Sequence, residues 1–155
     1  MEPGVVFWYA ARWGTLGSAV FSVMVFLFFR TGLVYTARTR EGKLKQDMPL
    51  SGYAAMSVVL FGVLGIQMYG FAYSGIVVAG FVDVFVLNYA LYLFLLFYDT
   101  FVIDILVLCV WRPGFLDVLE GEGFTSIRHH LWTLIPGSVA GFVGTLISTT
   151  LIVYF

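Results

Sequence analysis

Four long apolar runs, separated by short polar segments, set the pattern of this chain. Each run has about the 20 residues that an α-helix needs to cross the hydrocarbon core of a bilayer. The first run exceeds the roughly 7–15 residues of a signal-peptide core, so we expect it to be retained. The pattern predicts an all-α, integral membrane four-helix bundle that forms one transmembrane domain over residues 1–155. The runs cover about residues 13–35, 51–78, 81–111 and 136–155.

Composition supports a membrane protein. Hydrophobic residues make up 61% of the 155 residues and charged residues only 11%, against about 25% charged residues in a soluble domain. The mean hydropathy is +0.97, and the net charge of −1 argues against nucleic-acid binding. The single cysteine, Cys109, has no partner in the chain for a disulfide, and its apolar neighbours indicate a packed or lipid-facing side chain.

The basic residues predict how the chain is oriented. Seven of the eight lysines and arginines lie in or beside the first connection, residues 36–50, and the third connection, residues 112–135. Because cytoplasmic loops are enriched in lysine and arginine, we expect both connections in the cytoplasm and both termini on the other side. The seven residues are Arg30, Arg38, Arg40, Lys43, Lys45, Arg112 and Arg128.

The third run is long and contains two acids, Asp99 and Asp104. As an α-helix of about 30 residues it would measure roughly 45 Å, so it must tilt or project into the cytoplasm. An ionised carboxylate at the centre of a membrane costs roughly 2.5–3.5 kcal/mol, which is why intramembrane acids are usually functional. The long third helix is therefore the first place to look for a site.

Helical geometry predicts that the two acids face different directions. In a regular α-helix, Asn88, Tyr92 and Asp99 fall within about 40° and form a polar stripe, whereas Asp104 lies about 140° from Asp99. The segment between residues 88 and 112 contains no proline or glycine that would indicate a kink. We therefore expect no pair of carboxylates that share a proton.

Small residues predict close helix packing. Gly14, Ser18 and Ser22 recur at four-residue spacing in the first run, and Gly137 and Gly141 form a GxxxG pattern in the last. Such faces bring membrane helices together, either within a compact bundle or between copies. Four short helices enclose little interior, so we expect a homo-oligomer or a subunit of a larger membrane complex, in contact with membrane lipid.

The third connection, RPGFLDVLEGEGFTSIRHHLWTLIPG, is the polar segment richest in chemistry. Pro113 and Gly114 are expected to end the third helix, and Thr125 or Ser126 can cap a new one. Pro136 suits the first turn of the last span, because a proline lacks the N–H that is not needed there. The titratable residues in between are Asp117, Glu120, Glu122, Arg128, His129 and His130.

Three interpretations of this connection stay open. In the first, its acids pair with Arg112 and Arg128 and its histidines lie at the headgroups. Alternatively, acids and histidines form a protonatable or cation-binding site on the cytoplasmic side, with candidate residues Asn88, Tyr92, Asp99, Asp104, Glu122, His129 and His130. Thirdly, a transition metal is held by a subset of Asp104, Glu120, Glu122, His129 and His130. The motifs HExxH, GxGxxG, GxSxG and the P-loop are absent, so no catalytic residue is assigned and no cofactor is firmly implied.

Residues 88–137 carry Asn88, the stretch YDTFVIDILVL, Pro113, then EGEG, RHH and a closing glycine. In this order they resemble the second half of an uncharacterised family of small four-span bacterial membrane proteins. The resemblance covers about a third of the chain and implies a four-helix protein of the bacterial inner membrane. It marks as positions of interest Asp99, Asp104, Glu122, His129 and His130.

An intramembrane acid favours an oligomeric transporter or ion-conducting protein over the other functions. A non-catalytic accessory or structural subunit is the first alternative, since the aromatic residues and glycine faces suffice for it. A membrane-embedded, metal-dependent enzyme acting on a lipid or a quinone-like molecule is the second.

Overall fold

The computed structural model describes residues 1–39, 43, 45–77, 80–116, 118 and 121–155, with the side chains of residues 122 and 123 left aside. Within these residues every regular element is a helix, so the predicted all-α fold is confirmed. Four helical stretches are long and apolar enough to cross a membrane. The elements are α1 (Pro3–Arg30), α2 (Val34–Ala37), α3 (Leu50–Ala72), α4 (Phe81–Tyr98), η1 (Asp99–Trp111), η2 (Gly114–Leu116), α5 (Glu122–Thr125) and α6 (Ile127–Tyr154).

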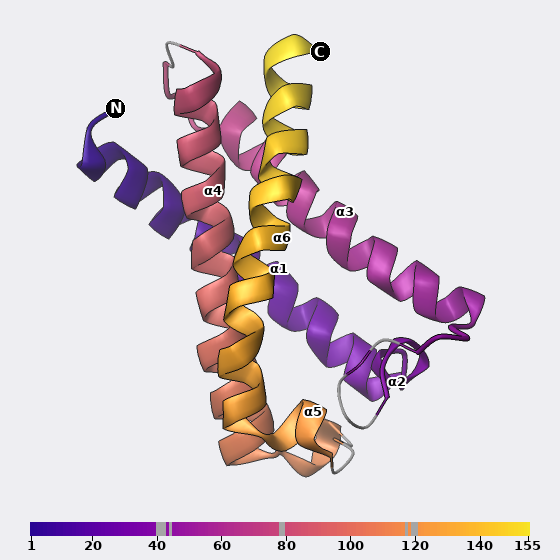
Figure 1. The fold of residues 1–155 in the computed structure, drawn as a ribbon. Coiled ribbons are helices and arrows are strands. Elements are labelled where there is room, and N and C mark those ends of the chain that lie inside the picture. Colours follow the sequence, from indigo (N-terminus) through magenta and orange to yellow (C-terminus); the bar gives the residue numbers. More distant parts are fainter. Residues whose placement is uncertain (40–42, 44, 78–79, 117, 119–120) are drawn as a thin grey trace.

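The long helices form two pairs, α1 with α3 and α4 with α6, and one pair crosses the other (Figure 1). Both termini, the end of α3 and the start of α4 lie at one end of the molecule, and α2 and α5 lie at the other. The predicted long third helix is confirmed, because α4 continues into η1 to give 31 helical residues, Phe81–Trp111. Two termini at one end fit an even number of spans; which end faces the cytoplasm stays a prediction.

The first helix begins about ten residues earlier than we predicted from the apolar run 13–35. Pro3 stands at the start of α1, where its missing N–H is no loss. Arg12 does not interrupt the helix, because arginine is a good helix former. Its guanidinium lies 5.3 Å from the ring centroid of Trp13. The helix ends at Arg30, since Gly32 has a φ of 72°, the left-handed conformation common after helix ends.

The last helix also begins earlier than the predicted boundary at residue 136. The Ser126 side chain accepts a hydrogen bond from the His129 N–H and caps α6, as expected of one of the two candidate caps. The new helix does not stop before the last span, so Pro136 lies inside α6 and not in its first turn. A proline inside a membrane helix is tolerated when neighbouring helices support the chain. The second helix ends at Ala72, short of the predicted residue 78, which lies outside the described residues.

A buried polar network links the four long helices where they cross. Gln67 in α3 donates to the backbone oxygen of Asn88 (3.1 Å) and to Thr145 (3.0 Å), and it accepts from Ser148 (2.8 Å). Tyr9 in α1 donates to the Asn88 side chain at 3.1 Å. In an apolar environment such bonds hold the bundle in one arrangement.

Replacing Gln67 with leucine is expected to lower the free energy of unfolding by about 1–2 kcal/mol, because it removes the three buried hydrogen bonds that join α3 to α4 and α6. Unfolding in detergent, followed by circular dichroism, measures this loss. Thr150→Val is the matched control, since the exposed Thr150 hydroxyl donates to Leu146 within its own helix. Equal stability of the two variants would contradict a linking role for Gln67.

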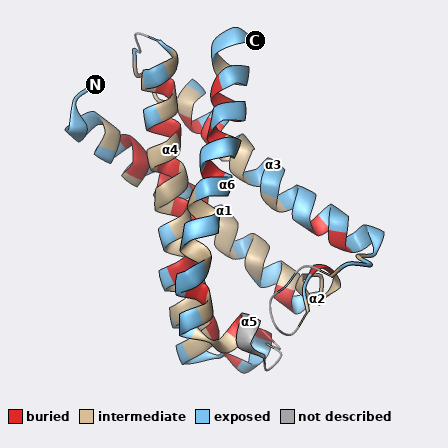
Figure 2. Ribbon diagram, in the orientation of Figure 1, coloured by how far each residue is buried: buried red, intermediate tan, exposed pale blue. Residues whose placement is uncertain are grey.

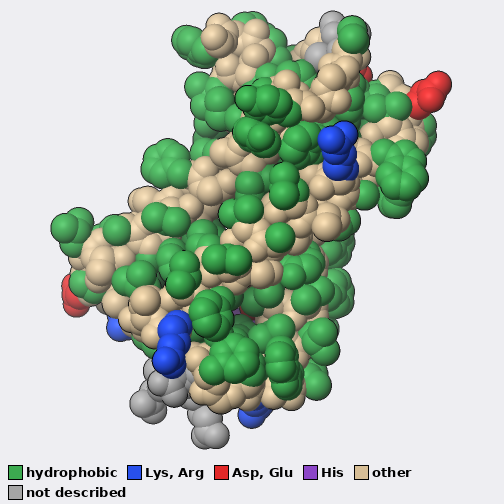
Figure 3. Space-filling model, turned by 180° about the vertical axis from the view of Figure 1, so that it is seen from behind, with side chains coloured by type: hydrophobic (Ala, Val, Ile, Leu, Met, Phe, Trp, Pro, Cys, Tyr) green, Lys and Arg blue, Asp and Glu red, His purple; other side chains and the backbone are tan. Residues whose placement is uncertain are grey.

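Most of the surface is apolar. Buried residues follow the lines where the helices meet, and the outward sides are exposed (Figure 2). The view from behind shows hydrophobic side chains over most of that face, with the charged side chains towards the two ends (Figure 3). This distribution is what a lipid bilayer requires, so the chain is a small polytopic membrane protein.

Candidate functional site

The segment that carries both acids is a π-helix. Over Asp99–Trp111 the backbone bonds reach five residues back, as in the 2.8 Å bond from the Arg112 N–H to the Val107 oxygen at its end. Most π-helical segments are single turns, and they occur frequently at functional sites. A segment of 13 residues is therefore unusual, and it begins at the first acid.

The π-helix brings Asp99 and Asp104 onto one side of the helix. When each N–H bonds to the carbonyl five residues earlier, residues five apart become neighbours along the same face. Our prediction that these acids point about 140° apart was wrong, because it assumed α-helical spacing. Both acids line the same cavity.

This cavity has a volume of about 610 Å³, within the range of pockets that hold small molecules. It lies between α1, α2 and α3 on one side and η1 and α6 on the other. Its polar lining residues are Arg38, Asp99, Thr100, Asp104, His129, His130 and Thr133.

An ion pair or hydrogen bond joins η1 to α6 inside this cavity. The His130 Nδ1 atom lies 2.8 Å from the Asp104 Oδ2 atom. His130 is buried, with 5% of its surface exposed, and its Nε2 atom has no hydrogen-bond partner among the described residues. With Nδ1 donating to Asp104, the Nε2 atom of a neutral His130 carries the free lone pair. The pair thus leaves one imidazole nitrogen ready to accept a proton.

Asp99 has two charged neighbours close enough to interact with it electrostatically, Asp104 and Arg38. Arg38 follows α2 and is exposed, whereas Asp99 and Asp104 are half-buried. The guanidinium therefore belongs to the outer part of the cavity and the carboxylates to its inner part. Arg38 was missed as a site residue, because in the sequence it is one of several loop residues that only indicated orientation.

The remaining predicted site residues are spread over different surroundings. His129 is half-buried and lines the cavity, with its ring centroid 5.7 Å from that of His130. Asn88 belongs to the buried network, and the Tyr92 hydroxyl donates to the Gly137 oxygen at 2.8 Å. Neither lies among the cavity-lining residues, so the structure does not bring the predicted polar stripe together as one site.

The predicted metal ligands are only partly described. Glu120 and the side chain of Glu122 lie outside the described residues. Among the residues that are described, no three histidine, cysteine, aspartate or glutamate side chains are placed to hold a metal ion. Asp104 and His130 provide two neighbouring groups, where a zinc site has at least three protein ligands.

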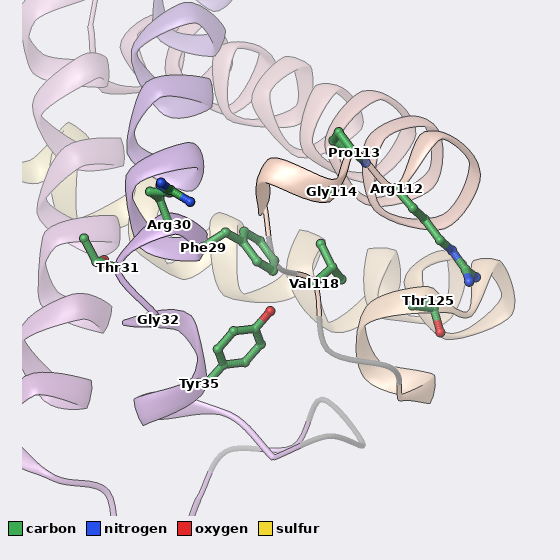
Figure 4. Close-up of a pocket in the computed structure, with 10 residues that line it drawn as sticks. All are labelled: Phe29, Arg30, Thr31, Gly32, Tyr35, Arg112, Pro113, Gly114, Val118 and Thr125. Atoms are coloured by element: carbon green, nitrogen blue, oxygen red, sulfur yellow. The ribbon is translucent and has the colours of Figure 1, made fainter.

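A second cavity, of about 650 Å³, lies beside the end of α1 and the segment that follows η1 (Figure 4). Arg30 and Arg112 contribute its charges from different elements, and the Arg112 Nε atom donates to the Cys109 oxygen at 3.0 Å. Phe29 lines both cavities and separates them. The described lining residues of the second cavity carry only positive charges, whereas the first, the acidic cavity, is lined by two carboxylates. The second cavity lies at the end predicted to be cytoplasmic.

Comparison with protein-family models, with curated proteins and with solved structures finds no match to this chain. The resemblance of residues 88–137 to small four-span bacterial proteins therefore stays a prediction.

Proposed function

We propose that this membrane protein is a small transport or ion-conducting protein whose protonatable site consists of Asp99, Asp104 and His130. The observation that carries the proposal is the π-helix, which turns both carboxylates into one cavity where Asp104 meets His130. We also propose a location in the bacterial inner membrane, which rests on the resemblance of residues 88–137.

The chemistry of these groups supports proton or cation handling. Carboxylates on an apolar helix are costly to ionise unless a positive charge or a proton accompanies them. An imidazole held by a carboxylate through one nitrogen accepts and releases a proton at the other. Asp104 and His130, whose atoms lie 2.8 Å apart, would exchange a proton directly, and Asp99 lines the same cavity.

A second candidate is an accessory subunit or a homo-oligomer. On α3, a Cβ atom added at Gly62 or Gly65 would meet nothing within 4 Å in the described part of the chain. Small residues of this kind allow membrane helices to approach closely, so this face suits a second helix from another chain or copy. Such an assembly is compatible with the proposed transport function.

Flux measurements in liposomes test the proposal. The purified protein, reconstituted with a pH-sensitive dye inside the vesicles, should dissipate an imposed proton gradient. Asp99→Asn and Asp104→Asn should each lower this flux at least tenfold, because the neutral amide takes up no proton and carries no charge to attract a cation. Asp47→Asn removes an exposed acid outside the cavity lining and should keep full flux. A wild-type flux equal to that of empty vesicles, or equal losses in all three variants, would overturn the proposal.

A further inference from the structure

The walls of the acidic cavity differ in chemistry. In the described part of the chain, α1 and α3 contribute only apolar side chains to its lining. The charged and titratable lining residues come from η1, from α6 and from Arg38 after α2. A ligand that fills this cavity therefore meets an aromatic and aliphatic surface on one side and carboxylates on the other. The residues on the apolar side are Phe21, Val25, Phe28, Phe29, Ala55, Met56 and Val59.

The charges of the described lining favour a monovalent cation. Asp99 and Asp104 contribute two negative charges, Arg38 contributes one positive charge, and the histidines contribute none when neutral. The balance is −2 + 1 = −1 when both acids are ionised. Because the cavity is largely apolar, this excess charge is costly without a cation or a proton beside it.

We propose that the cavity binds a lipophilic cation, meaning a molecule with one positive centre on a bulky apolar body. The apolar body packs between the aromatic residues of α1 and the wall of α3, and the positive centre lies beside Asp99 and Asp104. A small inorganic ion would leave the apolar wall without contacts, and a neutral lipid chain would leave the two carboxylates without a charged partner in the ligand. This inference names the cargo class of the proposed transport site and therefore rests on that function.

Protons and the cation compete for the same carboxylates. In the empty cavity a proton balances the excess charge, and a bound cation replaces it. Binding should therefore weaken as the pH falls and the carboxylates take up protons. The other titratable or charged groups that interact with or lie beside the two acids are Arg38, Tyr92, Cys109, His129 and His130.

Two probes of nearly the same size and shape but opposite charge test the inference. Tetraphenylphosphonium is a lipophilic cation and tetraphenylborate is the corresponding anion. Equilibrium dialysis of the purified full chain in detergent, against micelles alone, measures the binding of each. We expect saturable binding of the cation that weakens at least tenfold in Asp99→Asn and Asp104→Asn, and weakens at low pH. Asp47→Asn should bind as the wild type does.

A further variant tests the space in the cavity without changing the charge of its lining. Val59→Trp adds bulk on the α3 wall without changing a charge, and it should block binding of tetraphenylphosphonium while circular dichroism shows the same helix content. Equal binding of cation and anion, or full cation binding by the Val59 and Asp99 variants, would overturn the inference. Proton flux without cation binding would overturn the cargo class alone, whereas cation binding without any flux would overturn the transport function alone.

Discussion

Gly141→Leu should strongly destabilise this protein, because Gly141 is buried where α6 packs against α4. A Cβ atom at Gly141 would overlap the aromatic ring of Tyr92 on α4, and one at Gly137 would lie 3.0 Å from Leu96. Overpacking a well-packed contact costs about 1–3 kcal/mol, and leucine adds more than the Cβ atom. We expect a clear fall in the thermal unfolding midpoint in detergent, measured by circular dichroism.

Gly144→Leu is the matched control on the same helix. A Cβ atom at Gly144 would meet nothing within 4 Å among the described residues, so this variant should unfold near the wild-type midpoint. The GxxxG pattern would then serve the contact between α4 and α6 within one chain, and not association between copies. Equal losses in the two variants, or a change only in oligomeric state, would contradict this assignment.

The four helices were predictable because burial in lipid requires long apolar runs, and such runs are visible without any contact information. Their ends were less predictable. The apolar pattern predicts boundaries at Arg12 and Pro136, yet each lies inside a helix. A long arginine side chain can reach the interface from within a helix, and one lost backbone bond does not end a helix that its neighbours support.

The site was predictable in its residues but not in its geometry. The cost of a carboxylate in a membrane predicts Asp99 and Asp104 as site residues, and the titratable residues of the third connection include His130. That the two acids share one face depends on the π-helix, and residues 99–111 contain no proline or glycine to indicate one. Arg38 enters the site through the fold of the first connection, which its sequence does not specify.

The neighbourhood of Asp99 and Asp104 can be measured with cysteines. The variant would carry Asp99→Cys and Asp104→Cys with the native Cys109 changed to serine, so that two thiols remain. Cadmium bridges two thiolates only when both point to one place. Micromolar cadmium that bridges the two thiols protects them from labelling with a maleimide, and this protection is measured. A matched variant with Phe101→Cys in place of Asp104→Cys puts the second thiol two residues away, on another side of the helix.

Cadmium protection of the 99/104 pair tests most directly whether the π-helix turns both acids into one cavity. We expect near-complete protection of this pair and little protection of the 99/101 pair, since residues five apart are neighbours in a π-helix. An α-helix would place the two thiols about 140° apart. Unprotected thiols at 99 and 104 in the folded protein would therefore contradict the shared site.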